Sequence, residues 1–130
     1  MKLHLVDATY ELYRNYYAMP SILDPQGRQV GAVRGLMQTM LALLRGDDVT
    51  HVACAFDHEI NSFRNYLFDG YKTSVGVPED LLPQFELAEE AVSSLGVIVW
   101  PMIEFEADDA LATAVANWWE SEGVEQVVIC

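Results

Sequence analysis

Carboxylate side chains gather where the apolar segments of this sequence end. Asp7 closes the first apolar run and Asp57 closes the second, while Glu106, Asp108 and Asp109 follow the third. Acids at the ends of buried strands cost free energy unless something offsets their mutual repulsion. Oxygen-only ligands of this kind suit Mg²⁺ or Mn²⁺. These residue types therefore predict a divalent cation site that is built from several strand ends.

The last three acids also have a purely structural interpretation. Glu106, Asp108 and Asp109 lie where a helix is expected to begin, and the helix dipole stabilises acids there by about 0.3–1 kcal/mol each. On a helix of about 3.6 residues per turn, positions 106 and 109 share a face, whereas 108 points about 100° away from 109. If a cation is bound, we expect two of these acids to reach it directly and the third through water.

Two basic residues follow the second apolar run. Arg64 and Lys72 are eight positions apart, a spacing that allows both to project from one side of a helix or a hairpin. Beside a bound metal, such a pair would hold a phosphodiester and stabilise the negative charge of its transition state. The alternative is that both residues are ordinary solvated surface charges. Without the neighbouring acids, the sequence favours this alternative.

The pattern of apolar residues predicts the elements that position these groups. Continuous apolar runs predict strands over residues 2–6, 50–56, 96–100 and 125–130. Helical spacing predicts helices over residues 10–17, 30–45, 81–95 and 107–122. This alternation is typical of an α/β fold whose parallel sheet is covered on both faces. Functional residues gather at the carboxyl ends of such strands, so the acids are expected to meet there.

Charge and length limit the classes of function. The 130 residues fit one domain, and a hydrophobic fraction of 52% is typical of a folded chain. Seven basic and twenty acidic residues give a net charge of -13, and all seven bases lie within residues 1–72. Net charge therefore argues against general nucleic-acid binding, since contacts to phosphates need lysine and arginine. A local basic strip beside a metal would still be able to hold a phosphate.

Other features of the sequence predict compartment and packing. No apolar run approaches the roughly 20 residues that span a membrane. The apolar stretch at the N-terminus is too short for a secretory signal, so a cytoplasmic location is expected. Cys54 and Cys130 lie in apolar runs and are expected to be buried thiols. The sequence has no glycine-rich phosphate-binding loop, so no small-molecule cofactor is expected.

Tyrosines recur at helical spacing soon after Asp7. A half-buried helix face and a platform for stacking the bases of a single strand are the two interpretations that this spacing leaves open. The residues concerned are Tyr10, Tyr13, Tyr16 and Tyr17.

Several motifs in this order resemble a known family. They are LVDATYELYRNYYAMP, GAVRGLMQTMLALL, AFDHEINSFRNYLFDGYK, VPEDLLPQFELAEEAVSSLGV and FEADDALATAVA. The whole chain resembles the N-terminal part of the 5′→3′ exonuclease domain of bacterial DNA polymerase I. More broadly, it is similar to the flap endonuclease family. The resemblance implies a PIN-like three-layer sandwich over residues 1–130.

The resemblance also implies an activity and the residues that carry it. It implies a structure-specific nuclease that hydrolyses DNA phosphodiesters at 5′ ends or flaps with Mg²⁺ or Mn²⁺. The family's metal-site positions correspond to Asp7, Asp57, Glu106, Asp108 and Asp109. Catalytic roles correspond to Asp7 and to Arg64 and Lys72, the bases that approach the scissile phosphate.

The sequence departs from the family pattern in several places. Ala8 replaces the usual glycine after the first aspartate, and its methyl group is expected to crowd the substrate backbone. Thr73 to Val75 stand where the family commonly continues to an arginine. The family's further aspartates and helix–hairpin–helix region follow the fourth strand, so a fragment truncated after that strand is expected.

Two other functional classes remain as alternatives to the nuclease. The first is a non-catalytic PIN-like module that binds nucleic acid or a protein partner, which the acidic balance and the missing aspartates favour. The second is an acidic phospho-acceptor module of receiver type. A receiver would need paired acids after its first strand and a lysine after a late one, and the sequence has neither.

Overall fold

A four-stranded parallel sheet forms the centre of the protein, in a computed structural model that describes all residues from 1 to 130. The strands lie in the order β3-β2-β1-β4. Their bounds are Lys2–Asp7 for β1, His51–Asp57 for β2, Ile98–Met102 for β3 and Gln126–Ile129 for β4. All four predicted strands are confirmed, with bounds that shift by up to two residues.

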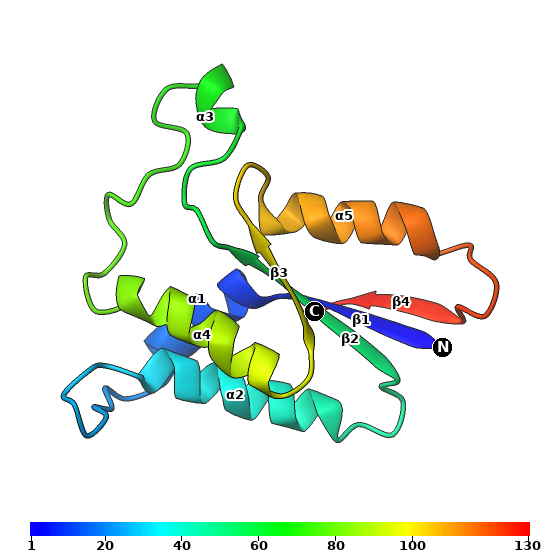
Figure 1. Cartoon of the computed structure of the whole chain (residues 1–130), viewed down its shortest axis with the longest axis horizontal. Coiled ribbons are helices and arrows are strands. Elements are labelled where there is room, and N and C mark those ends of the chain that lie inside the picture. The colour runs from blue at the N-terminus through cyan, green and yellow to red at the C-terminus, as the bar shows by residue number, and fades with distance from the viewer.

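Helices cover both faces of this sheet (Figure 1). One face carries three helices, α1, α2 and α4, and the other face carries α5 alone. Their bounds are Ala8–Ala18 for α1, Gly31–Leu44 for α2, Leu82–Ser94 for α4 and Ala107–Trp118 for α5. The α/β fold with three layers, predicted from the sequence, is confirmed.

Alternating side chains of the central strands form two separate cores. Leu5 of β1 and Ala55 of β2 face α5, in a small core of seven buried residues. Val6 and Phe56, the next residues along each strand, enter a core of 14 buried residues under the three-helix layer. Successive side chains of a strand point to opposite faces, and both faces here are covered, so the runs are apolar throughout.

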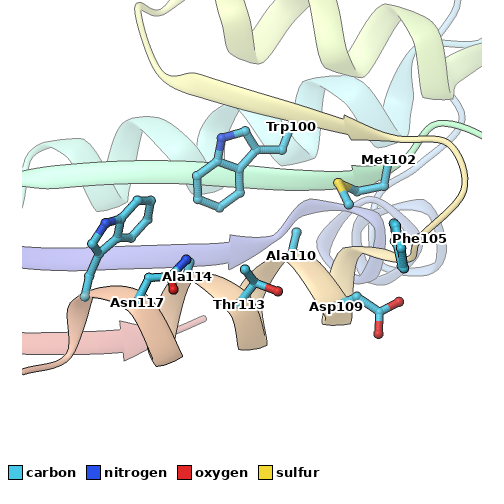
Figure 2. Close-up of a pocket in the computed structure, with 9 residues that line it drawn as sticks. Trp100, Met102, Phe105, Asp109, Ala110, Thr113, Ala114 and Asn117 are labelled. Carbon is cyan, nitrogen blue, oxygen red and sulfur yellow. The ribbon is translucent and has the colours of Figure 1, made fainter.

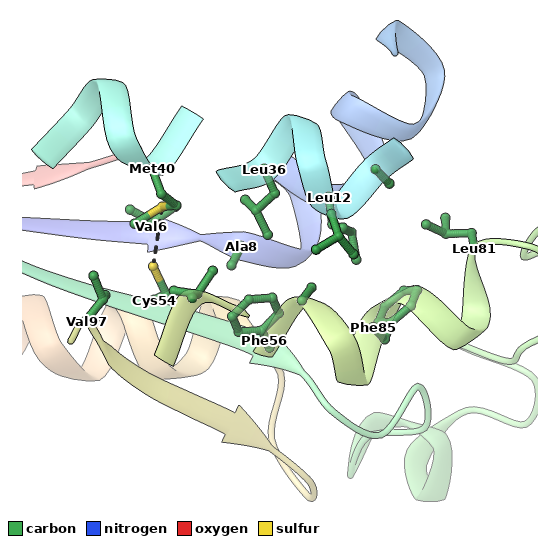
Figure 3. Packing of buried hydrophobic residues seen from close by; sticks show 14 residues of the cluster. Val6, Ala8, Leu12, Leu36, Met40, Cys54, Phe56, Leu81, Phe85 and Val97 are labelled. Carbon is green, nitrogen blue, oxygen red and sulfur yellow. Dashed lines mark hydrogen bonds between the residues drawn. The ribbon is translucent and has the colours of Figure 1, made fainter. Parts of the chain in front are cut away.

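Figure 3 shows the packing of the larger core. Leu36 and Met40 of α2 meet Val6 and Cys54 from the sheet, and the Sγ of Cys54 lies 3.8 Å from the Sδ of Met40. Cys54 is therefore a buried thiol, as predicted. The same prediction is wrong for Cys130, which is exposed, because β4 has a neighbouring strand on one side only.

Two helices of the three-helix layer pack unusually closely. A Cβ placed on Gly35 of α2 would lie 2.5 Å from Oδ1 of Asn15 in α1 and 2.8 Å from Cγ of Met19. Asn15 is buried and donates a hydrogen bond to the carbonyl oxygen of Glu11, so it has little freedom to move. The glycine in GAVRGL is therefore required by the α1–α2 contact.

The segment between β2 and α4 stands away from the three layers (Figure 1). It spans residues 58–81 and contains a short helix, α3, over Arg64–Leu67, which the sequence analysis did not predict. The amide nitrogen of Phe63 donates a 2.7 Å hydrogen bond to the carbonyl oxygen of Glu104, in the turn after β3. This contact holds α3 beside the carboxyl end of the sheet, where the acids lie. No helix of the structure is long and apolar enough to cross a lipid bilayer.

Candidate metal and phosphate site

A hollow of about 380 Å³ opens at the carboxyl edge of the sheet. It lies where β1 and β2 end and where α1 and α5 begin. Four of the five predicted acids line it, together with one of the two predicted bases. Its lining residues are Asp7, Thr9, Tyr10, Tyr13, Asp57, Lys72, Glu106, Ala107 and Asp108.

Asp7 is both the last residue of β1 and the N-cap of α1. Its Oδ1 accepts a 2.9 Å hydrogen bond from the backbone nitrogen of Tyr10, which satisfies a free N–H of the first helical turn. Burial raises the pKa of the Asp7 carboxyl, and the neighbouring charges of Asp108 and Asp57 raise it further, against the lowering effect of the Tyr10 N–H. The hollow therefore has an excess of negative charge around Asp7.

Asp57 ties three parts of the chain together at the end of β2. Its side chain is almost fully buried, and its Oδ1 accepts a 2.8 Å hydrogen bond from the backbone nitrogen of Ala107 at the start of α5. Its Oδ2 lies 2.7 Å from Nζ of Lys72. Its own backbone nitrogen donates a 2.8 Å hydrogen bond to Oγ1 of Thr9. The carboxylate is therefore fixed in direction by the fold.

The acids at the start of α5 divide into two groups. Glu106 and Asp108 line the hollow, whereas Asp109 lies beside it. Oδ2 of Asp109 turns back to accept a 2.9 Å hydrogen bond from the backbone nitrogen of Glu106. Positions 106 and 109 lie side by side as expected, since Nη1 of Arg64 contacts carboxylate oxygens of both residues. Only Glu106, the N-cap with extended backbone angles, lines the hollow.

Arg64 forms ion pairs with two acids of the α5 start. Its Nη1 and Nη2 lie 2.9 Å and 2.8 Å from Oδ2 and Oδ1 of Asp109, and Nη1 also pairs with Oε2 of Glu106. The hydrogen bond from Arg64 keeps the pKa of Asp109 below its ordinary value. Burial would raise the pKa of Glu106, but its bonds to Lys72 and Arg64 lower it overall.

Lys72 reaches the same acids from the far end of the segment. Its Nζ lies 2.7 Å from Oδ2 of Asp57 and 3.1 Å from Oε1 of Glu106. Burial would lower the pKa of Lys72, but the hydrogen bonds and charges of Asp57 and Glu106 raise it overall. About a third of the Arg64 and Lys72 side chains is exposed, and both are paired. The alternative of ordinary solvated surface charge is therefore wrong.

The chemistry of the donors fits a hard divalent cation, although the carboxylates are not gathered around one point. Four carboxylates face one hollow, and oxygen ligands of this kind suit Mg²⁺ or Mn²⁺. Burial is the main cause of the raised pKa of Asp7, and the charges of Asp108 and Asp57 add to it, so a bound cation would offset both effects. Nevertheless, no three His, Cys, Asp or Glu side chains lie close enough to hold a metal as they stand. Arg64 and Lys72 instead pair with Asp57, Glu106 and Asp109.

A second hollow, of about 450 Å³, is an apolar groove between β3 and α5 (Figure 2). Trp100 and Met102 of β3 form one wall, and Ala110 and Ala114 of α5 form the other. Asp109 lies at one end of the groove, at the start of α5. The groove has no other ionisable residue, so the chemistry belongs to the first hollow.

Residues 2–130 match the family described as "5'-3' exonuclease, N-terminal resolvase-like domain". This chain belongs to that family. The match to the 5'-3' exonuclease N-terminal domain covers every acid and base that has been placed in or beside the hollow.

Individual relatives carry consistent names. The chain is 33% identical over 130 residues to DNA polymerase I of Mycobacterium leprae, a match that covers 98% of this chain and 14% of that protein. It is 37% identical over 123 residues to the thermostable DNA polymerase I of Thermus thermophilus, covering 93% and 14%. It is 32% identical over 117 residues to a 5'-3' exonuclease of Bacillus subtilis, covering 86% and 40%. The chain thus spans less than half the length of each of these relatives.

Some residues of this exonuclease-family site were not singled out by the sequence analysis. Thr9 and the backbone of Ala107 orient Asp57, and Asn65 donates a 2.6 Å hydrogen bond from Nδ2 to the carbonyl oxygen of Lys72. A polar residue two positions after Asp7, at the start of the next helix, was the available signal for Thr9. Nothing in the local sequence indicated the Asn65 contact.

Ala8 does not crowd the hollow. It is fully buried, and its methyl group belongs to the larger core under the three-helix layer. The expectation that this methyl obstructs a substrate backbone is therefore wrong, because the first residue of α1 points away from the hollow and into the core.

Some tyrosines of α1 form a half-buried helix face, and others are exposed as a stacking platform would require. Tyr13 is half-buried and packs edge-on against Phe85, with ring centroids 5.9 Å apart. Tyr10 and Tyr17 are largely exposed, and Tyr16 donates a 2.7 Å hydrogen bond to Oδ1 of Asp80. Tyr10 and Tyr13 also line the hollow, so two of the four rings lie beside the acids.

Proposed function

We propose that this chain provides the metal- and phosphate-binding residues of a divalent-metal-dependent 5′ nuclease that hydrolyses DNA phosphodiesters. The observation that carries the proposal is the hollow itself. Acids from the ends of β1 and β2 and from the start of α5 face one another across it, with Lys72 among them. The family and the names of the relatives support a nuclease, and the carboxylate ligands support Mg²⁺ or Mn²⁺.

Each side chain has a distinct role in this proposal. Asp7, Asp57, Glu106 and Asp108 would hold the cation, with Asp109 as the fifth acid of the group. A cation bound there lowers the pKa of a water molecule and neutralises charge on a phosphate. Arg64 and Lys72 would then bind the non-bridging phosphate oxygens, where negative charge develops during hydrolysis.

The substrate we propose is DNA with a 5′ end or a 5′ flap. Support comes from the names of the relatives, which are DNA polymerases I and a 5'-3' exonuclease. The net charge of -13 disfavours general attraction to DNA, so binding has to rely on local contacts at the hollow. We propose the cytoplasm as the compartment, in keeping with a DNA substrate in bacterial relatives.

Cleavage of a 5′-labelled flap DNA in Mg²⁺ or Mn²⁺ tests this function. We expect short labelled products with the wild type, none in EDTA, and none with Asp7→Asn. Glu120→Gln is the matched control, because Glu120 is an exposed acid outside the hollow, and this variant should cut normally. Cutting that persists in EDTA or in Asp7→Asn would overturn the proposal.

A non-catalytic module that binds nucleic acid or a protein is the second candidate. It is favoured by one observation, namely that Arg64 and Lys72 pair with the acids and leave no three carboxylates placed around a metal. The cleavage assay separates the two candidates when it is combined with a binding measurement. Metal binding and DNA binding without any cleavage would favour the module.

A further inference from the structure

We infer that Arg64 and Lys72 are resident counter-ions of the acidic hollow, which an incoming divalent cation has to displace. Their release would then free the segment between β2 and α4, so that the two bases become available to a phosphate only after the cation is bound. This inference rests on the proposed function, since it concerns regulation of the same site.

The hydrogen bonds of the acids support the inference atom by atom. Both oxygens of Asp57 already accept a bond, one from the backbone nitrogen of Ala107 and one from Lys72. Both oxygens of Glu106 are paired, Oε1 with Lys72 and Oε2 with Arg64. Both oxygens of Asp109 accept bonds from the guanidinium group of Arg64. These three acids therefore offer no oxygen that lacks a donor.

Asp7 and Asp108 are different. Oδ2 of Asp7 accepts no hydrogen bond from the chain, and neither oxygen of Asp108 accepts one. These two acids are able to meet a cation without giving up any bond. At Oδ2 of Asp57 and at both oxygens of Glu106, a cation meets Lys72 or Arg64 on the same oxygen, and the repulsion between the two positive charges favours replacement of the base.

Arg64 and Lys72 are connected through the backbone and are expected to move together. Asn65 joins them, since its Nδ2 donates a 2.6 Å hydrogen bond to the carbonyl oxygen of Lys72 and its Oδ1 accepts one from the backbone nitrogen of Ser62. Residues 62–72 therefore form one braced loop that carries both bases. Within this loop, no residue of α3 is buried. The ion pairs to the acids therefore hold the loop in place together with the backbone hydrogen bond from Phe63 to Glu104.

The exchange is electrostatically reasonable. Five carboxylates in and beside the hollow face only two basic side chains, so the site keeps a net negative charge with the bases in place. A divalent cation brings its charge to one point among the acids, whereas the two bases are partly exposed and screened by water. The bases then face outward to solvent, where a phosphate is their natural partner.

Calorimetric titration of Mn²⁺ into the purified chain tests the inference. Removing a resident counter-ion should make Mn²⁺ bind more tightly, so we expect Arg64→Gln and Lys72→Gln each to lower the Mn²⁺ Kd about threefold, and the double variant about tenfold. Arg28→Gln is the matched control. It removes the same charge from an exposed residue paired with Asp24 in the loop between α1 and α2, which Figure 1 shows far from α3.

Each outcome of this titration has a distinct meaning. Tighter binding in the Arg64 and Lys72 variants, but not in Arg28→Gln, supports the inference. Wild-type binding with equal or weaker binding in these variants overturns the inference and leaves the proposed function standing. If neither the wild type nor any variant binds Mn²⁺, the metal site fails and the inference fails with it.

Hydrogen exchange provides a readout that does not depend on affinity. Saturating Mn²⁺ should speed the exchange of the backbone amides of residues 62–72 several-fold, while the amides of α2 stay protected. Asn65→Ala keeps every charge but removes the brace, and it should raise the exchange of this loop even without metal. Unchanged exchange of residues 62–72 on Mn²⁺ binding would contradict the release.

Discussion

The ammonium nitrogen of Lys72 lies 2.7 Å from Oδ2 of Asp57, the last residue of β2. The other oxygen of the same carboxylate accepts a hydrogen bond from the start of α5. One buried acid therefore connects a central strand, the segment that projects beyond the sheet, and the helix on the opposite face. The candidate site therefore also connects three elements of the fold, and its residues affect stability as well as chemistry.

Replacing Asp57 should separate these two roles. Asp57→Ala leaves the N–H of Ala107 and the charge of Lys72 without their partner, so we expect a loss of about 2–3 kcal/mol in the free energy of unfolding. Asp57→Asn keeps an acceptor for Ala107 and should cost about 1 kcal/mol. Urea unfolding measures both, with Glu120→Ala as the control that changes stability by less than about 0.5 kcal/mol. Equal stability of Asp57→Ala and the wild type would contradict this assignment.

Asp7→Asn should stabilise the protein in the absence of metal. The pKa of Asp7 is raised by burial and then by Asp108 and Asp57, so its ionised form is disfavoured in the folded state at pH 7. Asparagine keeps the helix cap and removes the charge. We expect a gain of up to about 1 kcal/mol after allowance for solvent screening.

The pH dependence of this effect has a definite sign. Because the folded pKa of Asp7 lies above its ordinary 3.8, the wild type gains stability as the pH falls through the folded value. The difference between the wild type and Asp7→Asn should therefore vanish below about pH 3.8, as followed by thermal unfolding across pH. Millimolar Mg²⁺ should reverse the order at pH 7, since it stabilises only the form that binds it. A variant that is less stable at pH 7 without metal would refute the argument.

Much of the fold was predictable because each layer has a local signal. The run from Leu3 to Val6 is apolar at every position but one, as expected for a strand that is buried on both faces, and the repeat in GAVRGLMQTMLALL has helical spacing. The acids were predictable for the same reason, since each ends a strand or begins a helix. Asp7 and Asp57 reach the hollow through the ordinary rule that parallel strands end at one edge.

The pairing of the bases was not predictable from local sequence. Arg64 meets Asp109 across 45 positions, and Lys72 meets Glu106 across 34. Neither spacing carries a periodic signal, because the segment between β2 and α4 is irregular apart from the short α3. The position of Asp109 beside the hollow, rather than in it, was missed for a related reason. It depends on the non-helical backbone angles of Glu106, which composition and spacing do not reveal.

His58 should titrate at a higher pH than an isolated histidine. Its Nδ1 lies 3.0 Å from both carboxylate oxygens of Glu89 in α4, and that contact raises the pKa of His58 above 6.5. The stabilisation from this pair is fully present below pH 6.5 and is lost as the pH rises through the raised value. A proton NMR titration should show the pKa of His58 falling toward 6.5 in Glu89→Gln. An unaltered His58 titration in this variant would mean that the pair does not form in solution.

The two thiols should react at very different rates. Cys54 is fully buried, and burial raises its pKa to about 12, so it has almost no thiolate at pH 8. Cys130 is exposed, and iodoacetamide should label it first. Mass spectrometry of the folded protein should find one label, at Cys130, and two labels in denaturant. Labelling of Cys54 at a comparable rate in the folded protein would place it outside the core described above.

The most direct test of the central claim is anomalous diffraction from crystals of the protein grown in Mn²⁺. The account predicts a strong anomalous peak in the hollow between Asp7, Asp57, Glu106 and Asp108, with Arg64 and Lys72 turned away from the carboxylates. Crystals that contain saturating Mn²⁺ but show no peak at this edge of the sheet, with both bases still paired to the acids, would contradict it.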